Sequence, residues 1–245
     1  MRTLRILPIV AVLFAAAPAS AQVSIWLQRG VSGWGFGMGV FLPEDATTVT
    51  VGGGYSYQGW IELDLTLAYT TFDEETLFGQ FDVGQYGLSP SVQFHPLKQS
   101  KTMPISLALT AGFNWSFLDS DNFVGDEGGG AYGVNGGVSV YRFFRLAESF
   151  GIIPAAAFNV AWSNPYVTDE FGDDVDLDSL TGISLSVGAY VAYIDSGGRV
   201  WGIVPQVAIP LNDDAGDDPV FGITINLIFS QVPRNPDGSV AMAGR

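Results

Sequence analysis

The side chains that could carry chemistry in this chain are few, and carboxylates dominate them. Its single histidine, His95, lies two positions after Gln93, and Glu62 lies two positions before Asp64. Residues two apart point to the same face of a β-strand, so each pair shares a face. A constriction lined by carboxylates favours cations. The same residues could instead form a satisfied polar cluster with Arg29 or His95 as counter-ion, because buried carboxylates need partners.

A second group of carboxylates has the spacing of a metal-binding loop. Asp174, Asp176 and Asp178 imitate the start of a calcium-binding EF-hand. Position six of that loop would be Ser179 rather than glycine, and position twelve would be Leu185 rather than glutamate. The EF-hand is therefore excluded. We expect no metal site and no cofactor. The alternative is a looser cation site within residues 169–178, which include these three aspartates, or within residues 213–218.

Composition excludes several classes of function. The chain has no cysteine, so thiol catalysis and cysteine-based metal sites are ruled out. Its formal net charge of -15 would repel nucleic acid, and we expect no such partner. Hydrophobic residues make up 47% of the chain and charged residues only 14%. This balance indicates apolar surface that faces something other than water.

The N-terminus has the features of a secretory signal peptide. Arg2 and Arg5 precede an apolar run at residues 6–17, and small residues at 19–21 give a cleavage pattern before Gln22. The apolar run is too short to cross a membrane as a helix. We expect residues 1–21 to be removed. Residues 22–32 show no steady alternation and are expected to form a plug or a lead-in to the first strand.

From residue 33 onward, apolar residues alternate with small or polar ones, which is the period of a β-strand. A tight hairpin is expected at Gln58 and Gly59. Pro90, Pro154 and Pro205 lie within strands, where we expect a bulge or a bend at each. The pattern predicts ten strands, at residues 33–42, 49–57, 61–69, 86–94, 105–115, 132–140, 152–162, 183–193, 201–209 and 220–229.

The last of these strands carries a family resemblance. Alternate residues from Phe221 to Phe229 are apolar, and Gly222, Thr224 and Asn226 lie between them. The strand resembles the C-terminal strand of Gram-negative outer-membrane β-barrel (porin-like) proteins, in which the terminal Phe is an assembly signal. The resemblance gives Phe229 that role. The family usually ends at this residue, whereas here residues 230–245 follow as a tail.

The resemblance implies an all-β fold, an antiparallel up-and-down transmembrane β-barrel of about ten strands over residues 33–229. It also implies the outer membrane of a Gram-negative bacterium as the location. Expected partners are outer-membrane lipid, lipopolysaccharide and the barrel-assembly machinery, with small solutes as possible cargo.

The connections between the predicted strands alternate in charge. The connections after strands one, three, five, seven and nine hold 20 of the 25 acidic residues and no lysine or arginine. The other connections hold Lys98, Lys101, Arg142, Arg145 and Arg199. Long loops face the cell exterior in outer-membrane barrels, so the acidic loops are expected outside. Aromatic residues near both ends of the strands would form two interfacial girdles.

Small residues fill most inward positions, so the lumen has several possible states. It could hold a narrow water-filled pore, it could be filled by residues 22–32 or by an extracellular loop, or the barrel could be flattened. We expect a porin-like passive channel for small solutes or a structural outer-membrane protein, and no enzyme. The alternatives are a binding or adhesion barrel acting through its acidic loops and an outer-membrane hydrolase. His95 argues against the hydrolase, because it falls at the periplasmic end of its strand.

Overall fold

A computed structural model describes residues 30–43, 46–76, 79–100, 102–118, 129–168, 174–195 and 199–231. Within these ranges the chain is almost entirely β-structure, with a single short 3-10 helix, η2 (Asp213–Ala215). The strands are β1 (Ser32–Leu42), β2 (Ala46–Tyr57), β3 (Ile61–Thr76), β4 (Gly79–Leu97), β5 (Ser106–Leu118), β6 (Gly129–Tyr141), β7 (Phe144–Ala147), β8 (Phe150–Thr168), β9 (Asp174–Asp176), β10 (Leu180–Ile194), β11 (Arg199–Pro210) and β12 (Val220–Gln231).

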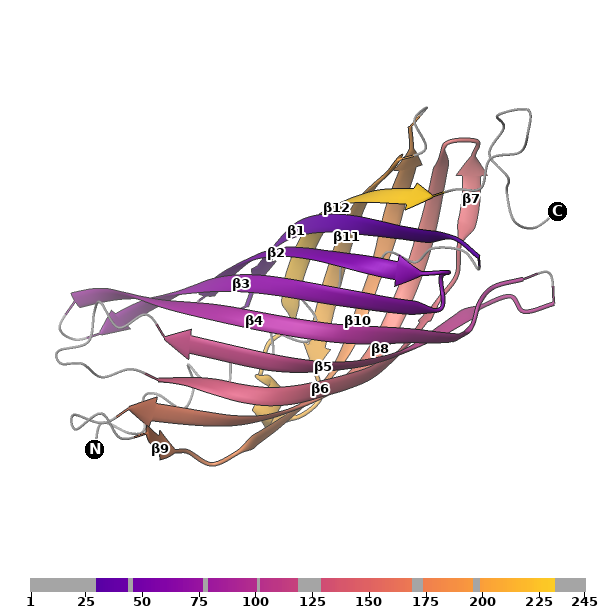
Figure 1. Cartoon of the computed structure of the whole chain (residues 1–245). Helices are drawn as coiled ribbons and strands as arrows, with labels where there is room; N and C mark the ends of the chain where they lie inside the picture. Colours follow the sequence, from indigo (N-terminus) through magenta and orange to yellow (C-terminus); the bar gives the residue numbers. More distant parts are fainter. Residues whose placement is uncertain are drawn as a thin grey trace.

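Ten of these strands close into an antiparallel barrel (Figure 1). Each barrel strand pairs with the next, β10 pairs with β8, and β12 returns to pair with β1. The pairing of β1 with β12 runs from Ser32 opposite Gln231 to Leu42 opposite Phe221. The predicted fold class and the closing role of the last strand are therefore confirmed. The short strands β7 and β9 pair only with β8, beyond the regular wall.

The tight hairpin between β2 and β3 is also confirmed. Gln58 and Gly59 both have left-handed backbone angles, with φ of 50° and 64°. Two successive left-handed residues twist in the sense that matches antiparallel strands, which is why asparagine, aspartate and glycine favour such turns. The Trp60 amide donates to the Tyr57 carbonyl across the turn, at 3.0 Å.

Of the bulge or bend expected at each of the three prolines, the strand pairing shows no bulge. The strand register runs unchanged past Pro90, Pro154 and Pro205. A proline lacks only its own N–H, so the pairing with one neighbouring strand is interrupted beside each proline while the register stays the same. Beside Pro90, for example, the pairing of β4 with β5 is interrupted between Leu88 and Ser91 and then resumes in the same register.

Two groups of acids expected in loops lie in strands instead. Residues 73–75 belong to β3 and residue 82 to β4, whose pairing continues to Thr76 opposite Gly79. Asp174–Asp176 forms β9. Backbone hydrogen bonding continues past the apolar part of the barrel, where neither face needs apolar side chains. The alternation that reveals a strand in the sequence is therefore missing there.

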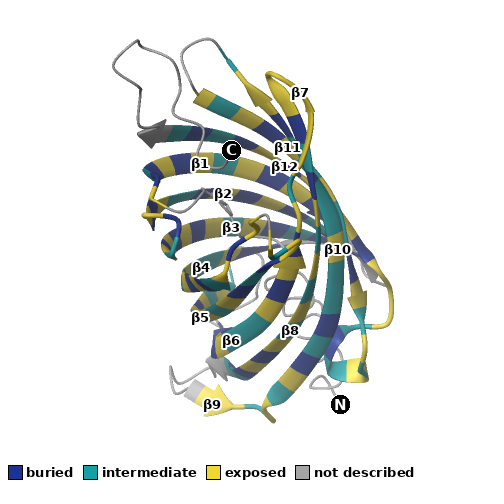
Figure 2. Cartoon of the chain, turned by 90° about the vertical axis from the view of Figure 1, so that its right-hand side faces the viewer, coloured by how far each residue is buried: buried dark blue, intermediate teal, exposed yellow. Residues whose placement is uncertain are grey.

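The outer surface of the barrel is apolar along its strands. Burial alternates from residue to residue, which gives the banded pattern of Figure 2. On β1, Phe36 and Met38 are 53% and 59% exposed and point outward, while Gly37 between them faces the lumen. A closed barrel with such a surface has no unpaired edge and suits hydrocarbon. Among the described residues, no helix is long and apolar enough to span a membrane.

Aromatic side chains gather on this outer surface near both ends of the strands. At the end that holds the acidic connections, Tyr69 contacts Tyr86 and Tyr86 contacts Phe117, with ring centroids 4.9 and 5.5 Å apart. At the opposite end, Trp34 stacks on Phe229 at 4.6 Å. These two zones correspond to the expected girdles, where amphipathic rings sit between hydrocarbon and headgroups.

Candidate functional site in the lumen

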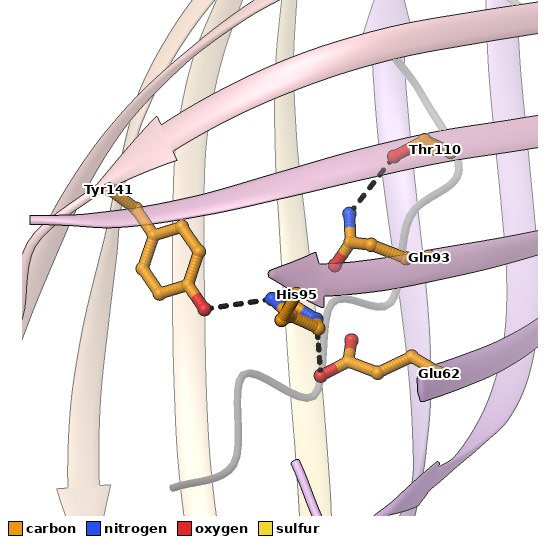
Figure 3. Close-up of polar contacts among 5 residues, drawn as sticks. All are labelled: Glu62, Gln93, His95, Thr110 and Tyr141. Atoms are coloured by element: carbon orange, nitrogen blue, oxygen red, sulfur yellow. Dashed lines mark hydrogen bonds and ion pairs between the residues drawn. The ribbon is translucent and has the colours of Figure 1, made fainter. Parts of the chain in front are cut away.

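The predicted polar residues of β3 and β4 meet inside the barrel. Glu62 lies directly opposite Gln93, and both point into the lumen together with His95 (Figure 3). The His95 Nε2 atom lies 3.1 Å from Glu62 Oε1, and both side chains are fully buried. The His95 Nδ1 atom lies 2.9 Å from the hydroxyl oxygen of Tyr141 on β6. The histidine is therefore hydrogen-bonded through Nδ1, while Nε2 lies within ion-pair distance of Glu62 without the geometry of a hydrogen bond.

A bulge in β4 shapes this cluster. The register of β4 against β5 shifts between Phe94 and Leu97. His95 and Lys98 are an odd number of residues apart and would face opposite sides of a regular strand. Both are buried here, because the extra residue turns Lys98 back toward the lumen. The Lys98 ammonium then lies 5.5 Å from the centre of the Tyr141 ring, within the range of a cation–π interaction.

The two remaining polar residues predicted for the site differ in their contacts. Gln93 Nε2 donates to Thr110 Oγ1 on β5, at 3.2 Å (Figure 3). Asp64 is only 7% exposed, and its Oδ1 atom has no hydrogen-bond partner among the described residues. This carboxylate lies against Gly54 of β2, where a side chain would collide with it. Arg29, the other predicted member, lies outside the described residues.

An apolar cluster lies next to the polar one, and the sequence analysis missed it. It consists of the inward residues Val31, Ala108, Tyr141, Ile153, Tyr190, Ala192 and Ile228. Tyr141 belongs to both clusters and joins them. Tyr190 on β10 is 2% exposed, and its ring lies against Gly202 of β11, where no side chain could fit. Extending the inward phase of β10 by one more step beyond Gly188 would have identified it.

The clusters together form a closing layer, defined here as Glu62, His95, Tyr141, Ile153, Tyr190 and Ile228. Its polar members come from β3, β4 and β6, and its apolar members from β6, β8, β10 and β12. β3 and β10 lie on opposite sides of a ten-stranded wall. The layer thus draws on side chains from across the lumen. The fully buried imidazole of His95 lies between Glu62 of β3 and Tyr141 of β6 and so links three strands of the wall.

The candidate metal ligands are not brought together in the part of the chain that the structure describes. No group of three or more acidic or histidine side chains there could hold a metal ion. Asp176 is exposed, and its Oδ1 atom accepts a hydrogen bond from Asn164 Nδ2 at 3.1 Å. Asp178 is also exposed. The side chain of Asp174, the expected signal peptide at residues 1–21 and residues 232–245 of the tail lie outside what is described.

No family model matches the chain, and no curated protein matches it. Solved structures with a similar fold include the β domain of the Bordetella autotransporter Brka, with 12% identity and a TM-score of 0.49, covering 82% of this chain and 99% of that chain. Another is the translocator domain of the autotransporter NalP from Neisseria meningitidis, with 10% identity and a TM-score of 0.46, covering 81% and 87%.

The outer-membrane protease OmpT from Escherichia coli is also similar, with 10% identity and a TM-score of 0.37, covering 82% of this chain and 92% of that chain. These values are too low to transfer any property of those proteins. The fold rests on the strand pairing of this chain itself, which defines a closed ten-stranded antiparallel barrel.

Proposed function

We propose that the chain is an integral outer-membrane barrel of a Gram-negative bacterium and acts as a structural wall protein whose lumen its own side chains close. The sequence led us to expect either a porin-like passive channel or a structural outer-membrane protein, and we propose the structural role. A porin-like passive channel is the competing role, and conductance separates the two.

The location is supported by three features. The N-terminal sequence has the pattern of a signal peptide, which directs export. The outer surface is apolar along the strands and carries aromatic rings toward both ends. Acidic residues gather in one set of connections and basic residues in the other. An exported closed barrel with a lipid-facing surface has the bacterial outer membrane as its usual location.

The closing layer is the observation that carries the structural role. His95 and Glu62 are fully buried, and Tyr190 and Ile228 are 2% and 3% exposed. Side chains that line an open aqueous channel would be accessible to water. A ten-stranded barrel has a backbone diameter of roughly 20 Å, so large side chains from opposite walls can meet across it.

The experiment begins with protein extracted from membranes in folded form. Unheated protein is expected to migrate differently from heated protein on a denaturing gel, as closed barrels commonly do. In planar bilayers, this folded protein is expected to produce no conductance steps. Regular steps from the wild-type protein would refute the structural role and favour the passive channel.

A variant tests whether the closing layer is responsible. Tyr190→Ala removes a large ring from the lumen and is expected to produce conductance steps that the wild-type protein lacks. Tyr193→Ala is the matched control, because that tyrosine lies on the same strand and faces outward with 51% exposure. Equal behaviour of the two variants would show that the layer does not control passage.

A further inference from the structure

We infer that the β7 hairpin, defined here as residues 142–150, binds an anionic phospholipid on its outer face, with the lipid phosphate on Arg142. The inference rests on the proposed location in the outer membrane and adds a lipid-binding site at the end opposite the acidic connections. Four observations carry it: the exposure of the hairpin, its continuity with the aromatic zone, the position of Arg142, and the excess of basic residues at this end.

The β7 hairpin lies beyond the end of β6 (Figure 1). Tyr141, the last residue of β6, lies opposite Ala155, whereas β8 begins at Phe150. The start of β8 therefore has β7 as its neighbour in place of β6. Every residue of β7 is exposed (Figure 2). The outer face of this extension is surface that the closing layer leaves uncovered.

The hairpin continues the aromatic zone of the barrel. Phe150 lies directly opposite Tyr193 of β10, and Tyr193 lies directly opposite Trp201 of β11. Residues that oppose each other directly in an antiparallel pair point to the same face of the sheet. The three side chains are 40%, 51% and 44% exposed, and all lie on the outer surface. The lipid-facing side of the wall therefore runs without a break onto the hairpin.

Arg142 lies on this same face. Phe144 is opposite Ile152, which shares the outward face of β8 with Phe150. Arg142 is exposed and precedes Phe144 by two residues, and its guanidinium carbon lies 4.7 Å from the centre of that ring. Leu146, also in β7, is 61% exposed. An arginine thus lies among apolar side chains on a surface that continues the lipid-facing wall.

Backbone contacts hold Arg142 in place. Its amide donates to the Pro154 carbonyl at 3.2 Å. The next amide, of Phe143, donates to Gln99 Oε1 at 2.7 Å, and Gln99 Nε2 donates to the Phe143 carbonyl at 3.1 Å. The Arg142 guanidinium itself forms no ion pair with any residue that the structure describes. Its position is fixed while its charge stays available to a ligand.

The other two arginines in the connections at this end already have partners. Arg145 donates to two carbonyl oxygens of its own turn, at 3.2 and 3.3 Å. Arg199 donates from Nε to Asp195 Oδ2 at 2.7 Å. Arg142 is therefore the arginine of this group best placed to take an anion from outside the chain.

The charge and the apolar surface together match an anionic phospholipid. The connections at this end hold five basic residues and two acidic ones, Glu148 and Asp195, whereas those at the opposite end hold 20 acids. An anionic headgroup is attracted here and repelled there. A guanidinium binds phosphate oxygens through two N–H groups, and the adjacent rings and Leu146 suit the first carbons of acyl chains. A soluble anion would leave these apolar side chains without a partner.

The absence of cysteine in the whole chain allows a fluorescent label at one chosen position. Leu146→Cys is labelled with an environment-sensitive fluorophore and folded into phosphatidylcholine vesicles. Ser149→Cys is the matched control, because that residue is exposed in the turn of the same hairpin. The label at 146 is expected to be quenched by a spin label on the lipid acyl chain near the headgroup, and the label at 149 by aqueous iodide. A label at 146 that responds only to iodide would overturn the inference.

Headgroup selectivity is then measured at position 146. Spin-labelled phosphatidylglycerol, as a minor component of the vesicles, is compared with the same fraction of spin-labelled phosphatidylcholine. Enrichment of phosphatidylglycerol by about fivefold is expected, the effect of one arginine at an anionic surface. Arg142→Gln should abolish the enrichment. Arg199→Gln should preserve it, because that charge is already paired.

Three results would overturn the lipid site. They are equal quenching by the two lipids, equal losses in the two arginine variants, and loss of the selectivity when inorganic phosphate is added at constant ionic strength. Quenching that falls as the protein-to-lipid ratio rises would also overturn it, because it would identify a second copy as the occupant. Each variant is first shown to be folded by its gel mobility.

The assay distinguishes failure of this inference from failure of the proposed function. Protein that does not insert into vesicles of either composition would refute both. Protein that inserts, produces no conductance steps and shows no headgroup preference would keep the wall function and lose the lipid site.

Discussion

Removing the imidazole of His95 should destabilise the barrel more than any lipid-facing truncation of similar size. In His95→Ala the Glu62 carboxylate stays buried but loses the group 3.1 Å away, and the Tyr141 hydroxyl loses its contact at 2.9 Å. Deleting one partner of a buried ion pair costs about 3–5 kcal/mol. We therefore expect the free energy of unfolding to fall by about 3–5 kcal/mol. Val92→Ala, on the outward face of the same strand, should cost less than about 2 kcal/mol.

A double-mutant cycle separates the pair from the rest of the cluster. Glu62→Gln keeps the shape of the side chain and removes its charge, so it should cost less than His95→Ala. In the double variant both sides of the contact between residues 62 and 95 are changed, and the two costs should fall short of additivity by about 1–3 kcal/mol. Additive costs would show that the contact between the two side chains contributes nothing of its own.

The measurement is urea unfolding of the protein folded in lipid vesicles. The folded fraction can be read from gel mobility and from the fluorescence of the six tryptophans. Each variant must unfold in a two-state transition, and the slope of its free energy of unfolding against urea concentration must equal that of the wild-type protein. A cost below about 1 kcal/mol for His95→Ala would refute the reasoning, because it would mean that the buried carboxylate does not depend on His95 for its stabilisation.

Three further predictions address the packing, the outer surface and the rim. Gly202→Ala should lower the free energy of unfolding in urea by about 1–3 kcal/mol, because its methyl group would overlap the ring of Tyr190. Gly87→Ala is the control and should be nearly neutral, because the nearest atom to its methyl group would be 3.5 Å away. Ile225→Arg should cost about 2–4 kcal/mol in vesicles if its face meets hydrocarbon, whereas Leu211→Arg, at an exposed position in the connection after β11, should cost little. Asn212→Ala removes an acceptor 2.7 Å from the Ile183 amide, so that amide should exchange with deuterium roughly tenfold faster, and unchanged exchange would contradict the assigned contact.

The strand count could be predicted from the sequence because one face of every strand is held to a strict requirement. A residue that faces lipid must be apolar, so the alternation survives along the whole hydrocarbon-facing part of each strand. Beyond that part the requirement ends while backbone pairing continues. This is why β3 and β4 extend to Thr76 and Gly79, well past the predicted ends at residues 69 and 86.

The contacts of the lumen site could be predicted only in part. The pairing of Glu62 with Gln93 follows from two neighbouring strands joined in a simple order. The contact of His95 with Tyr141 does not, because β5 separates their strands and the bulge after Phe94 alters the register. Alternation records which side a residue faces. It carries no information about which inward residues meet across the barrel.

The small inward residues left three states of the lumen open in the sequence: a pore, a plugged barrel or a flattened one. Inward glycines suggest gaps, yet two of these positions are covered by a ring from a neighbouring strand: Tyr190 lies against Gly202, and Phe41 lies against Gly222. An inward aromatic laid over a glycine fills the volume of two positions with one side chain. The packing of such a lumen therefore depends on pairs of residues across strands. A count of small residues on each strand alone overestimates the channel, and the few large inward residues decide whether it is closed.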